Sequence, residues 1–230
     1  MNQTLTDTRA GWHRHRWGRG WVEDTATVAQ TAWIDAAAEV ADCAVVEGHA
    51  WITDNARVSG CAKVCDNATV AGWARVEGNA KVSGNAWLAA DTLISDHAQV
   101  KDNAWIEGNI WIGEQATVGG NARLTDSVWV SGEALVEGRA WIAGAAWIEG
   151  HASVVSNRDY LHMMLLGYKM TAWRTKTNQI EVRYGCEMCP LDDWPRLLEN
   201  FCKRYQPERA AQYQAAVSAF LEMAHHSISR

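Results

Sequence analysis

The sequence contains little proline and phenylalanine: its 230 residues include three Pro and two Phe, beside eighteen Gly and fourteen Trp. So few prolines exclude a Pro-rich chain, and the glycines fall far short of the one residue in three that a collagen-like chain requires. No apolar run approaches the ~20 residues that a transmembrane helix needs. We therefore expect no membrane span and no membrane partner.

The dominant feature that is present is a repeat of six residues. Every sixth residue from Val22 to Val154 is Val, Ile or Leu, and the register never slips. A small residue, nearly always Ala, stands two positions before each aliphatic residue, and Gly or Asp usually stands two positions after it. A period of six fits neither an α-helix nor a simple hairpin meander, but it fits a short strand followed by a turn.

The repeat predicts a triangular coil. Side chains alternate along a strand, so the aliphatic residue and the small residue two positions earlier point inward together. The Gly or Asp, often followed by Asn, supplies the backbone of a corner. Three six-residue units make one coil, and stacked coils bury a column of Val and Ile.

Stretches such as VSGCAK (58–63) and VEGNAK (76–81) have the order aliphatic, small or acidic, two corner residues, small and variable. They resemble the hexapeptide-repeat superfamily, and the resemblance covers residues 20–156. It implies a mainly β fold, a left-handed parallel β-helix of seven to eight coils over residues 22–156, with residues 1–21 as an N-terminal cap. The fold alone indicates little about function.

Both ends of the repeat also carry a resemblance. The stretch RGWVE (19–23) is similar to the segment that leads into the first coil in the poorly characterised YdcK family of acyltransferase-like proteins and their phage-type relatives. The stretches TAWRT (171–175), IEV (180–182) and GC (185–186) resemble a module that follows the repeats in phage-type proteins.

Residues 157–230 are expected to form a small α+β module, because the six-residue period stops there. Strands are predicted over 159–166, 169–175 and 179–184. A helix capped by Asp192 or Asp193 follows, with Pro195 in its first turn, and a second helix is predicted over about 208–224.

The N-terminus lacks the apolar core of a secretory signal, so we expect a cytoplasmic protein. In a reducing compartment its six Cys are expected to be thiols rather than disulfides. Cys43 and Cys61 occupy the same corner in adjacent coils, and we expect them to pack together as thiols.

Many members of the superfamily are acyltransferases that use a coenzyme A thioester and a His near a loop that interrupts the coils. The unbroken register leaves no such loop here. His49, His97 and His151 occupy the same corner position, and His97 and His151 are three coils apart, too far to act together. We interpret them as corner residues. His97 or His151 would be weak candidates for a general base if the protein were an acyltransferase with its site between subunits.

The remaining cysteines give a weak signal for metal. Cys186 and Cys189 form a CxxC motif, but a zinc site normally has two clear pairs of ligands. The completing ligands would come from Cys202, His162, His225 or His226. We favour thiols without metal, and we expect no cofactor.

Beyond the first unit of the repeat, Trp fills eight of the positions directly before an inward aliphatic residue, and these positions face outward. Five lie on one face, with Thr69 and Arg123 in the gaps between them: Trp33, Trp51, Trp87, Trp105 and Trp141. Three lie on a second face: Trp111, Trp129 and Trp147. The third face has none. Rows of exposed indoles form an apolar patch of a size that is usually covered. The cover would be the C-terminal module, a sister subunit or a different protein.

The predicted β-helix is acidic, with seven Lys or Arg against eighteen Asp or Glu in residues 22–156. Such a surface repels phosphate, so we expect no direct nucleic-acid binding by the β-helix. Seven of its nine Asp occupy corner positions, where they serve turns. An acidic rod that mimics nucleic acid stays an alternative.

Together these features favour a non-catalytic protein-interaction β-helix that forms a homo-oligomer, a dimer or a trimer. The phage-type resemblance implies an inhibitor or adaptor that acts on a host protein through the Trp-lined acidic faces or the C-terminal module. The acyltransferase and the nucleic-acid mimic stay open as alternatives.

Overall fold

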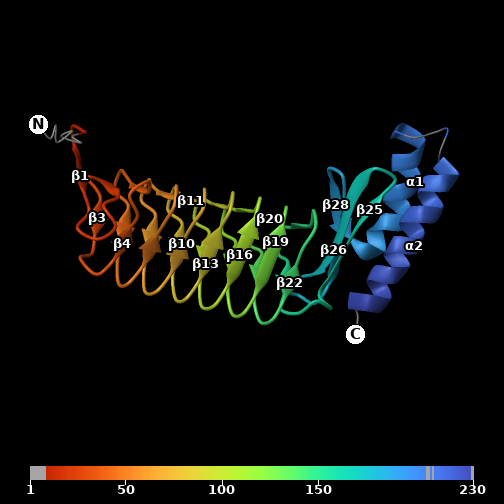
Figure 1. The fold of residues 1–230 in the computed structure, drawn as a ribbon. Helices are drawn as coiled ribbons and strands as arrows, with labels where there is room; N and C mark the ends of the chain where they lie inside the picture. The colour runs from red at the N-terminus through yellow and green to blue at the C-terminus, as the bar shows by residue number, and fades with distance from the viewer. Residues whose placement is uncertain (1–8, 206–207, 209, 229–230) are drawn as a thin grey trace, which may run out of the picture.

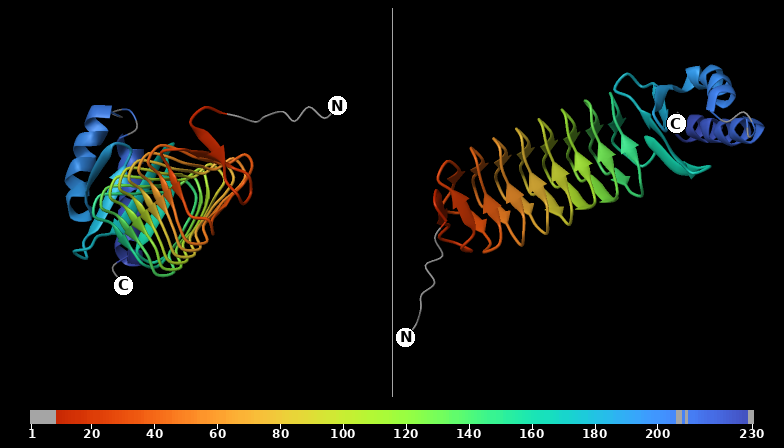
Figure 2. Two further views of the ribbon diagram at one scale, coloured as in Figure 1. Left: turned by 90° about the vertical axis from the view of Figure 1, so that its left-hand side faces the viewer. Right: turned by 90° about the horizontal axis from the view of Figure 1, so that it is seen from above.

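The chain forms a long rod that ends in a small α+β module (Figure 1). The computed structural model describes residues 9–205, 208 and 210–228, and the side chains of all of these except 201–205. The rod is a parallel β-helix of about seven turns, whose stacked coils are visible from the end and from above (Figure 2). The predicted fold class is confirmed.

Three sheets form the walls of the rod, because each short strand pairs with the strands 18 residues before and after it. Thr69, for example, lies between Trp51 and Trp87 in this register. Sheet 1 contains β1 (Trp12–Arg14), β2 (Trp21–Glu23), β5 (Glu39–Val40), β8 (Arg57–Val58), β11 (Arg75–Val76), β14 (Leu93–Ile94), β17 (Trp111–Ile112), β20 (Trp129–Val130) and β23 (Trp147–Ile148).

The other two walls follow the same order along the chain. Sheet 2 contains β4 (Trp33–Ile34), β7 (Trp51–Ile52), β10 (Thr69–Val70), β13 (Trp87–Ala89), β16 (Trp105–Gly108), β19 (Arg123–Asp126) and β22 (Trp141–Ile142). Sheet 3 contains β3 (Thr27–Val28), β6 (Val45–Val46), β9 (Lys63–Val64), β12 (Lys81–Val82), β15 (Gln99–Val100), β18 (Thr117–Val118), β21 (Leu135–Val136) and β24 (Ser153–Val154).

The repeated aliphatic residues fill the interior of the rod, as predicted. From Ile34 to Val154 every one of them has no exposed surface, and only Val28, in the incomplete first coil, is half-buried. The residue two positions earlier, which is Ala in all but three of these units, is buried with each of them. Because both residues of a unit face inward, the position between them faces outward and is free of the core.

The backbone conformation at the corners explains why Gly and Asp are common there. From Asp42 to Gly150, the residue two positions after each aliphatic residue has a positive φ, a region that favours Gly and tolerates Asp. At Gly84 a Cβ would lie 2.7 Å from the backbone oxygen of Asp102 in the next coil. An Asp at this position does more than tolerate the turn: the Asp66 carboxylate accepts the Gly84 N–H at 2.9 Å.

A second ladder runs along the same corners. The amide of Asn67 donates to Asn85 at 3.2 Å, Asn85 to Asn103 at 3.0 Å, and Asn103 to Asn121 at 3.4 Å. These side chains join adjacent coils outside the sheets, so the corner composition stabilises the stack as well as the turn.

The described part of the N-terminal segment lies against the first coil. Strand β1 pairs antiparallel with β2, which ends the parallel stack of sheet 1. The Arg9 guanidinium lies 3.6 Å from the ring centroid of Trp12, and that of Arg14 lies 3.7 Å from Trp21.

The C-terminal module closes the other end of the rod with an antiparallel sheet and two helices. Its strands are β25 (Tyr160–Leu165), β26 (Tyr168–Arg174), β27 (Ile180–Tyr184) and β28 (Glu187–Pro190), followed by a 3-10 turn (Leu191–Asp193), α1 (Trp194–Tyr205) and α2 (Ala210–Ile228). Trp173 of β26 is fully buried in the core of the rod, where it covers the last coil. No helix among the described residues is long and apolar enough to cross a membrane.

Several sequence-based expectations need correction. Cys43 and Cys61 form a disulfide rather than a pair of thiols, because the shared corner brings their Cα atoms to 4.8 Å. Strand β28 was not predicted, and α2 extends to Ile228 rather than ending near residue 224. Asp192 and Asp193 lie in the 3-10 turn directly before α1, and Pro195 is in the first turn of that helix.

Candidate interaction surfaces

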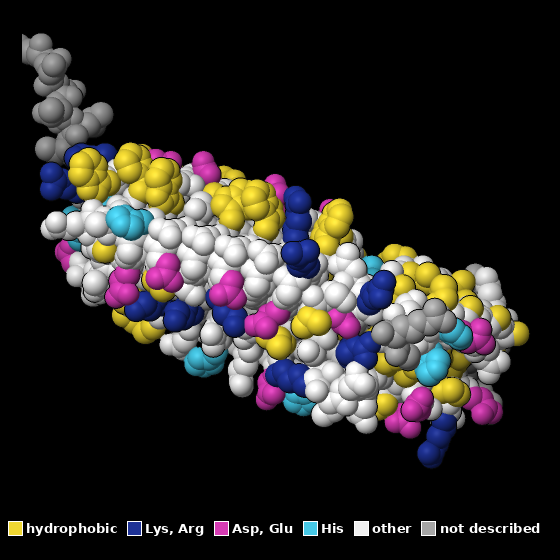
Figure 3. All heavy atoms as spheres, turned by 90° about the horizontal axis from the view of Figure 1, so that it is seen from below, with side chains coloured by type: hydrophobic (Ala, Val, Ile, Leu, Met, Phe, Trp, Pro, Cys, Tyr) yellow, Lys and Arg dark blue, Asp and Glu magenta, His cyan; other side chains and the backbone are white. Residues whose placement is uncertain are grey.

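The five Trp residues of sheet 2 form a straight row that we call the Trp ridge. They stand on stacked strands and point outward, as predicted. Figure 3 shows apolar side chains along the upper edge of the rod, interrupted by pale and dark blue side chains. The exposed fractions are 37% for Trp33, 52% for Trp51, 40% for Trp105 and 53% for Trp141, while Trp87 is half-buried.

The indoles of the ridge lie in pairs. The ring centroids of Trp33 and Trp51 are 5.8 Å apart with the rings stacked at 22°, and those of Trp87 and Trp105 are 3.9 Å apart at 44°. The close contacts hold these four rings in place, because each packs on an indole in an adjacent coil, while Trp141 lies beside Arg123. The ridge is therefore a row of supported aromatic platforms on a rigid sheet.

Two residues other than Trp interrupt the ridge. Arg123 stands between Trp105 and Trp141, and its guanidinium lies 5.4 Å and 5.9 Å from their ring centroids. Thr69 stands in the same way between Trp51 and Trp87. The two gaps therefore have the same register but hold side chains of different length and charge.

The sequence analysis missed Trp73, which is the most exposed large apolar side chain among the described residues, at 64%. Trp73 lies at a corner rather than before an aliphatic residue, so the search for Trp in one position of the repeat did not find it. It belongs to the coil of Thr69 and borders the ridge at that coil.

The three Trp of sheet 1 form a different surface. The ring centroids of Trp111 and Trp129 are 5.3 Å apart, and those of Trp129 and Trp147 are 5.6 Å apart. The C-terminal module reaches this group: the Arg183 guanidinium lies 4.1 Å from the Trp147 ring and pairs with Glu149. A hollow of about 130 Å³ remains between these indoles, Ser131, Glu149 and Arg183.

The module therefore covers only part of one Trp face. It lies beyond the last coil in Figure 1 and in the right view of Figure 2, and it does not fold back along the ridge. Of the three expected covers, the C-terminal module accounts for Trp147 and leaves the ridge exposed. Trp147 also keeps a buried indole N–H without a hydrogen-bond partner among the described residues.

The candidate histidines do not come together. Gln115 and Glu133 occupy the two coils between His97 and His151, as the backbone hydrogen bonds of this corner show. His97 and His151 are exposed. His151 Nδ1 lies 3.4 Å from a Glu133 carboxylate oxygen, beside a hollow of about 230 Å³ lined by Gln115, Thr117, Glu133, Ala134, Leu135 and Lys176.

The CxxC motif lies at the hairpin between β27 and β28. Cys186 is exposed at the turn, and Cys189 is half-buried on β28 opposite Val182. Burial, with Asp193 and Glu187 adding to it, raises the pKa of Cys189 to about 11, so this thiol is protonated at neutral pH. The side chain of Cys202 lies outside the described residues. Among those described, no group of three or more His, Cys, Asp or Glu is placed to hold a metal.

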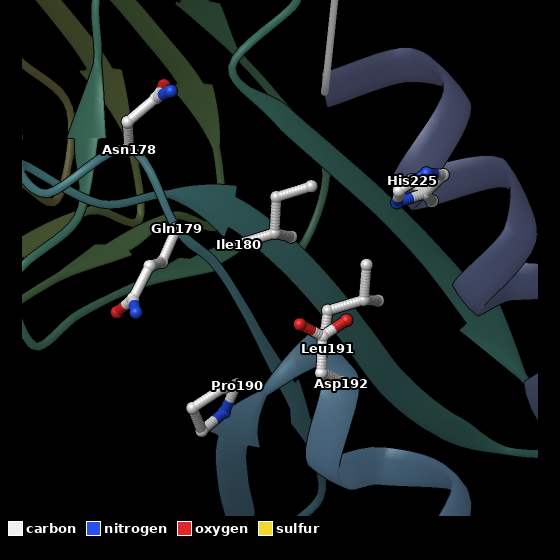
Figure 4. A pocket seen from close by; sticks show the side chains of 7 residues that line it. All are labelled: Asn178, Gln179, Ile180, Pro190, Leu191, Asp192 and His225. Carbon is white, nitrogen blue, oxygen red and sulfur yellow. The ribbon is translucent and has the colours of Figure 1, made fainter.

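The largest hollow described in the module, about 250 Å³, lies between the start of β27, the 3-10 turn and α2 (Figure 4). Its lining consists of Asn178, Gln179, Ile180, Pro190, Leu191, Asp192 and His225. The side chains around it are mostly exposed and come from three segments, and in Figure 4 His225 points across the hollow from α2. The hollow is shallow and polar, with no fixed constellation of catalytic groups.

No protein-family model matches the chain, and a search of the curated proteins finds no match either. The resemblance to the hexapeptide repeat is carried by the coils themselves. The closer resemblance to the YdcK family and to phage-type proteins stays a prediction.

Proposed function

We propose that this protein is a non-catalytic interaction β-helix that binds a partner protein through the Trp ridge. The observation that carries the proposal is the row of indoles, four of them between 37% and 53% exposed, on a single rigid sheet. If each presents on the order of 100 Å², the ridge presents about 500 Å² of apolar surface. A standard interface buries about 800 Å² on each partner, so the ridge supplies the apolar centre of one.

A protein partner fits this surface better than a small ligand does. The ridge is a line of convex platforms and has no cavity among the hollows described above. Trp is the residue type most enriched among the few that dominate binding energy in protein interfaces. In keeping with the phage-type resemblance, the partner would be a host protein that is inhibited or recruited by the binding.

The test has two parts. Trp51→Ser with Trp105→Ser removes one indole from each pair of the ridge. Val45→Ser with Leu135→Ser, at the same position of the repeat on sheet 3, is the matched control. Light scattering reports the oligomeric state, and capture from host extract followed by mass spectrometry reports the partner.

We expect the Trp variant to lose the captured protein while the control keeps it. If light scattering shows that the Trp variant falls from an oligomer to a monomer, the ridge is a seam between copies of this chain. Capture of the same protein by all three forms would reject the ridge as the binding surface.

A second candidate function is acyl transfer, because Glu133 gives His151 a carboxylate partner beside a hollow. His151 would take the proton of an acceptor hydroxyl or amine, the acceptor would attack the thioester carbonyl, and coenzyme A would leave as its thiol. Saturable calorimetric binding of acetyl-coenzyme A that His151→Ala weakens, and His97→Ala does not, would support this candidate over the first.

A further inference from the structure

The two gaps of the Trp ridge are equivalent in register. Trp51, Thr69 and Trp87 pair in adjacent coils, as Trp105, Arg123 and Trp141 do. In the second gap a long side chain extends over the flanking indoles. In the first gap Thr69 is too short to reach the rings, and the outward positions beside it hold small residues, Ala71 and Ala89. The chain thus contains one filled and one open version of the same arrangement.

The filled gap shows what the open gap accepts. The Arg123 guanidinium lies within 6 Å of two ring centroids, at 5.4 Å and 5.9 Å, a cation–π geometry. The chain uses the same pairing at its N-terminal cap, where Arg9 and Arg14 stack on Trp12 and Trp21. A planar guanidinium suits this position better than an ammonium group, because it stacks on aromatic faces and is more weakly hydrated.

The net negative charge of the β-helix favours a cation at the open gap. Asp54 and Asp91 lie at the corners of the coils on either side of Thr69, and both are exposed. The whole β-helix has eighteen acidic against seven basic residues. The Trp73 indole borders the same coil, so a cation that enters the gap meets aromatic rings and negative charge together.

We propose that the gap at Thr69, between Trp51 and Trp87, is a receptor for an arginine side chain from a basic segment of the partner protein. This inference rests on the proposed function and names the chemistry of the partner. The partner's guanidinium takes the place between two indoles that Arg123 takes three coils further along the ridge. The acidic β-helix attracts the segment, and the gap selects arginine within it.

Short synthetic peptides test this directly. The probe is a Gly/Ser peptide with spaced arginines, and the matched probes replace every arginine by lysine or by neutral citrulline. Binding to the full chain is measured by calorimetry and by indole fluorescence. We expect the arginine peptide to bind with one site per chain, the lysine peptide to bind several-fold more weakly, and the citrulline peptide not to bind.

Two substitutions in the ridge make opposite predictions. Thr69→Arg fills the gap from within and should weaken the arginine peptide at least tenfold, while Thr117→Arg, at the equivalent position of sheet 3, should change its affinity less than twofold. Arg123→Thr opens the second gap, so the number of sites per chain should rise from one to two.

Unchanged peptide binding by the Thr69→Arg variant, or equal binding of the citrulline peptide, would overturn the proposal. The same variants separate it from the proposed function. If Thr69→Arg keeps the captured partner while the double Trp variant loses it, the ridge is the interface but the gap is no arginine receptor. If both variants keep the partner, both proposals fail.

Discussion

Trp173 is the residue through which the module stabilises the rod, and its replacement by Ala is our most specific prediction of stability. The side chain belongs to β26 of the module but is fully buried among the inward residues of the coils. Its indole N–H donates to Glu181 at 3.1 Å. The bridge between Ala152 and Thr175 holds the neighbouring backbone against the last coil.

The expected cost follows from these contacts. Truncation of a fully buried Trp to Ala typically costs about 3–5 kcal/mol, which is a large part of the roughly 5–15 kcal/mol that stabilises a domain. Trp173→Phe keeps most of the buried volume and loses the hydrogen bond to Glu181, for which we expect about 1 kcal/mol. The difference between the two variants therefore measures the contribution of the covered coil end.

Hydrogen exchange shows where the stability is lost. Coils of a β-helix contact only their neighbours, so the loss should be greatest in the last coils and fade toward the N-terminus. Trp194→Ala is the matched control: it removes an equally buried Trp whose indole N–H donates to Val182 within the module core. Its effect should be confined to the module.

The result that would refute this reasoning is a Trp173→Ala protein with even loss of protection along the rod, or with a loss of stability below about 1 kcal/mol. Either outcome would mean that the last coil is stable without its cover. The Trp173→Phe variant is the control for substitution at this position as such, because it changes the same residue with little change of volume.

Three further predictions concern the corners and the cysteines. Replacing Cys43 and Cys61 by Ser should lower the free energy of unfolding by about 3 kcal/mol, as expected for a closed loop of this length. Denaturant unfolding with and without reductant measures this difference. Equal unfolding midpoints for the natural protein and the Ser variant under oxidising conditions would contradict the role of the disulfide. Hydrogen bonds from the Glu114 N–H and, to a smaller extent, the Ser95 hydroxyl lower the pKa of Asp96, so its contribution to stability is present above the pKa of the unfolded chain and is lost as the pH falls through the folded value. The melting temperature of the Asp96→Asn variant should therefore fall less on acidification than that of the natural protein. Identical profiles of melting temperature against pH would reject this. Because the pKa of Cys189 is raised to about 11, iodoacetamide at pH 8 should alkylate the exposed Cys186 well before Cys189. Peptide mass spectrometry measures the two alkylation rates, and equal rates would contradict the raised pKa of Cys189.

The walls and the core of the rod could be predicted because two independent periods agree in the sequence. The two-residue alternation assigns each residue to the inside or the outside, and the spacing of 18 residues assigns it to a sheet. Once Val22 and Val154 are joined by an unbroken register, the face of every Trp before an aliphatic residue is determined. The ridge and the Trp of sheet 1 were found in this way.

The position of the module could not be predicted, because it depends on non-periodic contacts, such as the burial of Trp173 in the core of the rod and the ion pair of Arg183 with Glu149. In the sequence Trp173 is one residue of a predicted strand, and no sequence pattern indicates that it covers the last coil. The disulfide was missed for a different reason. The register correctly placed Cys43 beside Cys61, but an expectation about the compartment outweighed the geometry.

Sheet 3 provides an internal comparison for the meaning of the ridge. Its outward residues occupy the same position of the same coils as the ridge residues, and six of the eight are polar: Thr27, Lys63, Lys81, Gln99, Thr117 and Ser153. From Val46 to Val154 the strands of sheet 3 pair and bury their aliphatic residues as completely as those of sheet 2. The fold therefore does not require an indole at the outward position, because the strands of sheet 3 form without one. Five of them on one sheet carry a risk of aggregation that a folding role would not explain, which supports the proposal that the ridge binds a partner.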